Sequence, residues 1–349
     1  MKGPTAAIMA TLGGDNHMYL TFNTLWVFMM LYGAVVLLYY VICVIDILMD
    51  LFVRSPISLD DFGAGQGKWA VVTGCTDGIG KEMALQLADK GFNIILLSRT
   101  PEKLEQVKQG IESKGAKAIA YAVDFASCSS QRWDEIATII NSNEVSVLAS
   151  KIAIWIAFVV NNVGVCHKNQ IFFDKEKHAA CDDIVKVNVN SMMDITRIVV
   201  PQMQTRKNGL IINLGSFAAM RAMGFLSVYA ASKSFIKTFS QSLAYELEPD
   251  GIMLPTYIAA GKPTLSIPSA ETFVKALFDH LGLRCGAADS HTSIPYYPHA
   301  ILNFITSCLW DPVLATPVNY SVANNLYQLG QQRQKRHATK EFELKNAGY

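Results

Sequence analysis

The chain has 349 residues, enough for one large α/β domain with extensions. Hydrophobic residues make up 51% of it, charged residues only 17%, and the formal net charge is +1. This near-neutral balance gives no support for nucleic-acid binding. The 7 cysteines are scattered, with no C-x-x-C pair, so neither a metal site nor a redox motif is expected.

The apolar excess has a local source near the N-terminus. After a tail over residues 1–17, residues 18–45 contain no charged side chain. This run exceeds the roughly 20 apolar residues that a helix needs to cross a bilayer. A cleaved signal peptide is the alternative, but its apolar region is only about 7–15 residues long. The sequence therefore predicts a retained transmembrane anchor over residues 18–53, whose orientation its charges do not indicate.

The amino-acid composition changes after the anchor. Residues 54–67 are rich in Gly, Pro, Ser and Asp and are interpreted as a linker. From residue 68, β-rich runs ("KWAVVTG", "FNIILLSR", "KAIAYAVD") alternate with segments of helical pattern, one of which opens with Thr-Pro, a strong helix start. Such alternation predicts an α/β fold with a Rossmann-type, doubly wound parallel sheet, here assigned to residues 68–282.

Residues 283–349 are interpreted as a C-terminal extension. Within it, residues 296–310 are aromatic and apolar but too short for a confident span. We expect this segment to pack on the domain or to lie at a membrane interface, with a second span as the alternative. The polar tail that follows is expected to be loosely held.

A glycine turn lies where the first strand feeds the first helix. In "TGCTDGIG", Gly74, Gly78 and Gly80 have the spacing G-x-x-x-G-x-G. Glycines there let backbone N–H groups at a helix N-terminus approach a pyrophosphate. A glycine turn alone is a weak signal, but its place in an alternating domain favours a dinucleotide site. The expected cofactor-binding residues of this turn are Gly74, Thr76, Asp77, Gly78, Ile79 and Gly80.

The end of the second strand bears on which dinucleotide binds. Arg99 stands there, and no Asp or Glu occurs between Asp89 and Glu102. A carboxylate at this point would bind the ribose 2′-hydroxyl of NAD, whereas a cation suits a 2′-phosphate. NADPH is therefore the favoured cofactor, although a solvated surface arginine is the plain alternative. Asp124, at the tip of the third strand, is placed to hold the adenine amino group, or else to cap a helix.

Ser216, Tyr229 and Lys233 follow one another at intervals of thirteen and four residues. Tyr229 and Lys233 share one helix face. A lysine cation beside a tyrosine, whose ordinary pKa is near 10, is expected to lower that pKa together with the positive nicotinamide of an oxidised cofactor. Tyr229 can then act as a general acid toward a carbonyl. Ser216, at a strand end, would stabilise the same oxygen. A lone Ser or Tyr is more often structural, so the case depends on their joint position.

Together these residues resemble the short-chain dehydrogenase/reductase family. The motifs "TGCTDGIG", "NNVG", "VNVN" and "YAASK", with the serine at Ser216, appear in order over roughly residues 68–250. The resemblance implies that Asn188 completes a catalytic tetrad with Ser216, Tyr229 and Lys233, through a water bound to Lys233. It also implies that Lys233 holds the ribose hydroxyls, and that Asn162 and Gly164 line the cofactor.

Within that family, "NNVG", "GSF", "ETFVK" and the lead-in "DFGAGQGKWAVVTG" are most similar to the very-long-chain 3-oxoacyl-CoA reductases of microsomal fatty-acid elongation. The resemblance implies a very-long-chain 3-oxoacyl-CoA substrate and the endoplasmic reticulum membrane, with the catalytic domain facing the cytosol. Other fatty-acid elongation enzymes are the implied partners. A steroid or retinoid ketone reductase remains an alternative, as does a catalytically impaired scaffold subunit.

Two departures from the family pattern motivate the scaffold alternative. Residues 149–159 form an apolar insertion before "NNVG". It is expected to lengthen or distort a central strand, since strands usually run about 5–6 residues; we also expect its deletion to leave stability unchanged. The loop after Met253, which in the family contacts the nicotinamide and covers the substrate, is shortened here, so that contact has no assigned residue.

Overall fold

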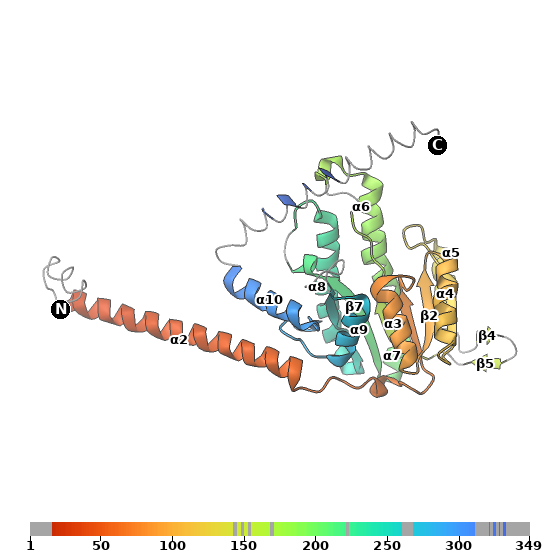
Figure 1. Ribbon diagram of the computed structural model, residues 1–349, viewed down its shortest axis with the longest axis horizontal. Coiled ribbons are helices and arrows are strands. Elements are labelled where there is room, and N and C mark those ends of the chain that lie inside the picture. The colour runs from red at the N-terminus through yellow and green to blue at the C-terminus, as the bar shows by residue number, and fades with distance from the viewer. Residues whose placement is uncertain are drawn as a thin grey trace.

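The computed structural model describes residues 16–141, 145–147, 150–152, 155–167, 171–220, 223–259 and 268–310, with isolated positions between 321 and 332. It consists of a layered α/β domain from which one long helix, α2 (Asn16–Phe52), projects (Figure 1). The shortened loop after Met253 falls largely between residues 260 and 267, outside the described residues, as does most of the polar C-terminal tail.

The domain is built on one parallel sheet, and the predicted Rossmann-type fold is confirmed. The strand order is β10-β9-β7-β6-β1-β2-β3, with β8 paired to the start of β7. The chain leaves β1 in one direction for β2 and β3 and later returns to its other side with β6, which creates a switch point between β1 and β6. The strands are β1 (Trp69–Thr73), β2 (Asn93–Ser98), β3 (Ala118–Ala122), β6 (Ile156–Asn161), β7 (Gly209–Ser216), β8 (Ile252–Met253), β9 (Thr256–Ala259) and β10 (Thr292–Ser293).

Helices cover both faces of the sheet. Alternate residues of one strand point to opposite faces, so Ala70 and Val72 of β1 pack on one side while Trp69 and Val71 pack on the other. The first face is covered by α3 (Gly78–Asp89), α4 (Pro101–Glu112) and α9 (Ala270–Asp279), and the second by α5 (Ser130–Asn141), α7 (Ser191–Arg206) and α8 (Ser227–Leu247). Burial on both sides explains why the central strands are continuous apolar runs.

The apolar insertion does not lengthen the central strand, so that part of the expectation is wrong, but the pairing of β1 with β6 is distorted by a register shift. β6 has 6 residues. Residues before it form a separate antiparallel pair, β4 (Val145–Val147) with β5 (Ser150–Ile152), drawn apart from the main sheet in Figure 1. The only irregularity recorded in the pairing of β1 with β6 is a register shift between Trp69 and Ala70. Because β4 and β5 do not pair with the main sheet, their backbone N–H and C=O groups form hydrogen bonds with each other.

The structure changes what deletion of residues 149–159 should do. Ile156, Phe158 and Val159 are fully buried in β6, so the deletion removes core residues. It also joins "VSVL" directly to "VN", which supplies a mainly apolar strand of the same length in place of "IAFVVN". We expect cooperative unfolding to persist, with the melting temperature lowered by about 2–8 °C, because valine would replace phenylalanine in the core. Thermal denaturation tests this, and a chain with no cooperative transition would show that the insertion is integral.

Segments on either side of this core also pack against it. Phe62, in the short helix η1 (Leu59–Phe62), is buried, and the backbone N–H of Ile57 donates to the Leu281 carbonyl at 2.9 Å. Beyond residue 282, β10 extends the sheet, and the last continuously described segment ends in α10 (Tyr297–Trp310). Ile294 and Ala300 are fully buried there.

The last turns of α2 are tied to the domain by ion pairs. Arg54 contacts Asp46 at 2.7 Å and Asp50 at 2.6 Å, and Arg284 contacts Asp46 at 3.0 Å. Asp50 is only 2% exposed and accepts the backbone N–H of Cys285 at 2.9 Å. A buried carboxylate with several donors holds its surroundings in one geometry. The junction between α2 and the domain is therefore held by ion pairs and by a buried hydrogen bond.

Candidate active site

The residues predicted from sequence converge on one edge of the sheet. The glycine turn follows β1, Arg99 follows β2, Asp124 lies just beyond β3, residues 162–164 follow β6, and Ser216 ends β7. All of these are carboxyl ends of parallel strands, which lie at the same edge. Ligands of doubly wound sheets bind at this edge, beside the switch point between β1 and β6.

Ser216 and Tyr229 form the centre of the site. Ser216 is the last residue of β7, and its Oγ accepts the backbone N–H of Ala218 at 3.2 Å. Tyr229 lies in the first turn of α8, and its phenol is hydrogen-bonded to the Ser216 hydroxyl. Two hydroxyl groups therefore meet at one point, where a carbonyl oxygen could accept a hydrogen bond from each.

Burial raises the pKa of Tyr229, while the hydrogen bond from Ser216 opposes this shift. Burial has the largest effect on this pKa, and Lys233 is not among the groups that shift it in this structure, which holds no cofactor. The phenol consequently holds its proton at neutral pH. A group that must give a proton to a developing alkoxide needs that protonated form.

Lys233 lies one helical turn beyond Tyr229 and is 5% exposed. Its Nζ donates to the carbonyl oxygen of Leu214 at 2.9 Å. Burial lowers the pKa of Lys233 to about 8, so the side chain is still mainly a cation at neutral pH. A methyl group at Gly164 would come within 3.4 Å of Lys233 Nζ and of Asn188 Oδ1, so this glycine separates the two polar groups at close range.

Asn188 lies in a π-helical turn (Lys186–Asn190) between α6 (His178–Val185) and α7. Its Oδ1 accepts the backbone N–H of Val165 at 2.8 Å, and its Nδ2 donates to the Val165 carbonyl at 3.0 Å and to Ser232 Oγ at 2.9 Å. Single π-helical turns are frequent at functional sites. Asn188 thus fixes the segment after β6 against α8, which carries Tyr229 and Lys233.

The glycine turn has the geometry that phosphate binding requires. Gly74 and Gly78 have φ of 63° and 52°, the left-handed region that favours glycine. A side chain at Gly78 would meet nothing within 4 Å, so the N-terminus of α3 is open there. Asp77 caps this helix by accepting the Gly78 N–H at 2.8 Å, and Thr76 Oγ1 bonds Ser98 Oγ at 2.8 Å. These residues fit a dinucleotide pyrophosphate at the helix N-terminus.

The side chain of Asn162 holds this glycine turn in place through hydrogen bonds. Its Nδ2 donates to the carbonyls of Thr73 and Gly74 at 3.1 and 3.0 Å. Thr73, which sequence reasoning missed, reinforces the contact because its Oγ1 accepts the N–H groups of Asn162 and Val163, each at 3.0 Å. Only its position before Gly74 could have drawn attention to Thr73.

Arg99 and Asp124 border the same edge. Arg99 is exposed and directly follows Ser98, the last residue of β2. Asp124 is also exposed, and its Oδ1 accepts the backbone N–H of Ala126 at 3.1 Å. This is a local turn and not a helix cap, since α5 begins at Ser130. Both side chains are therefore exposed at the edge of the sheet where ligands of such folds bind.

A buried histidine next to Tyr229 was also missed. His167 Nε2 lies 3.4 Å from the backbone N of Tyr229, and His167 Nδ1 lies 3.2 Å from Glu176 Oε2. These partners assign the proton to Nδ1, so that Nε2 accepts the Tyr229 N–H. The imidazole thereby satisfies a free N–H group in the first turn of α8. No sequence pattern pairs His167 with Glu176.

Replacing His167 by alanine should lower kcat by about tenfold, because Tyr229 loses the acceptor that fixes its backbone and the partly buried Glu176 is left without this partner. The conservative variant His167→Gln should recover most of the rate, since its amide can serve both partners. Steady-state kinetics, with melting temperatures and the Kd for NADPH measured alongside, tests this. Equal loss of rate in both variants would contradict the positioning role.

A glycine turn suited to a dinucleotide and two hydroxyl groups that can donate a proton lie at one edge of the sheet. This combination serves hydride transfer to a carbonyl, so the protein is an oxidoreductase that uses a nicotinamide dinucleotide. A sequence profile described as short chain dehydrogenase matches residues 68–261. The chain belongs to the short-chain dehydrogenase/reductase family.

Similar proteins refine this placement. The chain is 35% identical to a very-long-chain 3-oxoacyl-CoA reductase of Coprinopsis cinerea over 77% of its own length and 80% of that protein. It is 33% identical to one of Kluyveromyces lactis over 84% and 87%. A metagenomic short-chain oxidoreductase solved in complex with NADP has a TM-score of 0.53 at 24% identity, covering 65% of this chain and 96% of that one. The structural likeness shows the fold alone.

Proposed function

We propose that the protein reduces very-long-chain 3-oxoacyl-CoA to 3-hydroxyacyl-CoA with NADPH during fatty-acid elongation at the endoplasmic reticulum membrane, its catalytic domain facing the cytosol. The observation that carries the proposal is the Ser216–Tyr229 hydroxyl pair, one helical turn from buried Lys233. Relatives named for this reaction share 33–35% identity with the chain over about four-fifths of its length, which supports the substrate class.

When bound, NADPH would supply the hydride that the 3-carbonyl carbon of the substrate accepts. Tyr229 transfers its phenolic proton to the carbonyl oxygen, and Ser216 donates a hydrogen bond to that oxygen as negative charge develops. The Lys233 cation stabilises the phenolate left on Tyr229 and holds the ribose hydroxyls. Asn188, which fixes the loop beside Lys233, is proposed to keep a water there for reprotonation.

The preference for NADPH is proposed from Arg99. Its guanidinium is exposed at the end of β2, where it can pair with a 2′-phosphate. The variant Arg99→Gln should raise the KM for NADPH by about tenfold or more and leave that for NADH nearly unchanged. Kinetics with both cofactors tests this, and Arg197→Gln, at an arginine that is 75% exposed, is the control. An unchanged ratio of the two KM values would contradict the assignment.

We also propose that α2 is a retained membrane anchor. Within residues Thr21–Phe52, an 18-residue stretch has a mean hydropathy of 2.4, and none of that stretch is buried in the protein. A cleaved signal sequence would pass the same test of length and composition. The last turns of α2, however, supply the buried Asp50 and its contact with Cys285, which the mature domain would lose on cleavage. Elongation enzymes of the same membrane remain the proposed protein partners.

The substrate class is tested by comparing kcat/KM for a long-chain 3-oxoacyl-CoA with that for a steroid or retinoid ketone. We expect the acyl-CoA to be preferred by at least tenfold. A wide preference for the steroid or retinoid would overturn the proposed substrate and support the other branch of the family. Saturable NADPH binding without turnover of either would support the impaired scaffold.

A further inference from the structure

Helix α10 packs one face on the domain and exposes an apolar face on its other side. Residues 292–310 contain no Asp, Glu, Lys or Arg. The inner face of α10 is buried on the domain through Ala300 and Asn303, whose Nδ2 donates to the Gly286 carbonyl at 3.1 Å. The opposite face exposes Tyr297, Ile301, Leu302 and Ile305 to between 45% and 55%. Tyr297, Ile301 and Ile305 follow at intervals of four residues and Leu302 lies three before Ile305, which gathers them on one side of the helix.

This exposed face adjoins the proposed membrane span. The rings of Tyr40 and Phe304 pack edge to face, with centroids 6.4 Å apart. Figure 1 shows α10 lying beside the domain-proximal half of α2. Tyr40 precedes the end of α2 by twelve residues, or about 18 Å along the helix axis. The contact is thus within the apolar run of α2, at a depth that lipid would occupy if α2 spans.

The inner face of α10 reaches the active site. His299 packs edge to face on Phe217, with ring centroids 5.3 Å apart, and Phe217 directly follows Ser216. Ala300 belongs to an apolar cluster with Ile258, against which Leu51 of α2 and Phe217 pack. One continuous set of apolar contacts therefore joins the end of α2, helix α10 and the segment that carries the catalytic serine.

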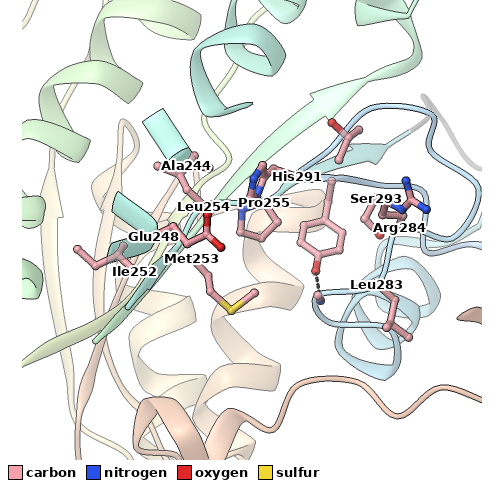
Figure 2. Close-up of a pocket in the computed structure, with 13 residues that line it drawn as sticks. Ala244, Glu248, Ile252, Met253, Leu254, Pro255, Leu283, Arg284, His291 and Ser293 are labelled. Atoms are coloured by element: carbon pink, nitrogen blue, oxygen red, sulfur yellow. Dashed lines mark hydrogen bonds between the residues drawn. The ribbon is translucent and has the colours of Figure 1, made fainter. Parts of the chain in front are cut away.

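The other cavities and clusters point less clearly to a ligand. The hollow in Figure 2, about 340 Å³, is lined by residues such as Met253, Pro255 and His291. It lies at the amino ends of β9 and β10, away from the catalytic edge.

We infer that the exposed face of α10 lies in the acyl region of the bilayer and guides the acyl chain of a membrane-partitioned substrate to Ser216 and Tyr229. The inference rests on the proposed function for the substrate and on α2 as a span. Lipid is the occupant because the face is uncharged and continuous with the apolar surface of α2. Because α10 contacts both the span and the segment that carries Ser216, it fixes the distance between the bilayer and the catalytic residues.

Contact with lipid can be tested on the unmodified full-length chain in phosphatidylcholine vesicles. A phosphatidylcholine with a diazirine in mid-acyl chain should label peptides of α10 as well as α2. Peptides of α8 are the control, because exposed Phe235 and Tyr245 lie there. Labelling of α2 without α10 would overturn the inference. So would cross-links between α10 helices of two chains, which would identify a second copy as the occupant.

The path of the acyl chain is tested with the triple variant Ile301→Glu, Leu302→Glu and Ile305→Glu. Its KM for a long-chain 3-oxoacyl-CoA in vesicles should rise at least tenfold, while kcat/KM for a short, water-soluble 3-oxoacyl-CoA stays within twofold. The matched control Phe235→Glu with Tyr245→Glu should change neither. An unchanged long-chain KM would overturn the path. If the wild type reduces neither substrate, the proposed function fails, and lipid labelling alone decides the position of α10.

Discussion

Replacing Tyr229 by phenylalanine is expected to lower kcat by about 10²–10⁴-fold, the usual contribution of a positioned general acid. The ring is retained, so the packing of the first turn of α8 is preserved and only the proton donor is lost. The hydrogen bond to Ser216 is lost with it. Because the glycine turn and Arg99 are untouched, the Kd for NADPH should stay within about threefold of the wild-type value.

Stopped-flow measurement of NADPH oxidation, with cofactor binding followed by fluorescence, separates these quantities. Ser216→Ala is the companion variant. It should lose less rate than Tyr229→Phe, because it removes one of two hydrogen bonds to the carbonyl oxygen and leaves the proton donor in place. A Tyr229→Phe enzyme with nearly full turnover would show that another group supplies the proton.

Gly80→Ala is expected to disrupt the cofactor turn. A Cβ at this position would lie 2.2 Å from Asn162 Nδ2 and 2.3 Å from the Gly74 carbonyl oxygen. The second atom is backbone in a turn that is itself fixed by hydrogen bonds from Asn162, so relief requires movement of the turn. We expect a loss of about 1–3 kcal/mol in the free energy of unfolding. NADPH affinity should fall by at least about a hundredfold, because the N–H groups that cradle the pyrophosphate shift with the turn.

Gly110→Ala is the matched control for this variant. It lies in α4, and a Cβ there would meet only Leu85 Cδ2, at 3.4 Å. Alanine favours a helix over glycine by about 1 kcal/mol, so this variant should be neutral or slightly stabilised and should bind NADPH normally. Thermal denaturation with and without NADPH distinguishes the two. Normal cofactor stabilisation of Gly80→Ala would contradict the close packing of the turn.

The central fold and most of the candidate site follow from local sequence signals. Strand–helix alternation gives the parallel sheet, and a parallel sheet brings all its carboxyl ends to one edge. Gly74, Ser216 and Arg99, far apart in the chain, could therefore be placed together in advance. The i, i+4 spacing likewise fixes Tyr229 and Lys233 on one face of α8.

The fate of the insertion could not be predicted in the same way. Residues 145–148 and 156–159 are both short apolar runs suited to a buried strand, and periodicity alone does not choose between them. The structure places the second run in the sheet as part of β6 and pairs residues 145–147 of the first run with β5. The choice depends on competing tertiary contacts, such as those of Phe158 with Phe92 and Phe278.

Electrostatics and side-chain pairing depend on the folded arrangement as well. Spacing indicated that Lys233 lies near Tyr229, but not that burial would dominate the pKa of both groups. The contact of His167 with the backbone of Tyr229 joins residues 62 positions apart, and no motif marks it. For the same reason, the position of α10 between α2 and Phe217 emerges only from the folded structure.

The central claim is most directly tested by product analysis in membranes that carry the full-length protein. Given NADPH and a very-long-chain 3-oxoacyl-CoA, they should form 3-hydroxyacyl-CoA in a 1:1 ratio to NADPH oxidised, because one hydride and one proton reduce one carbonyl. Membranes carrying Tyr229→Phe should form almost none. Saturable NADPH binding with no 3-hydroxyacyl-CoA from the wild-type protein would contradict the proposed reaction.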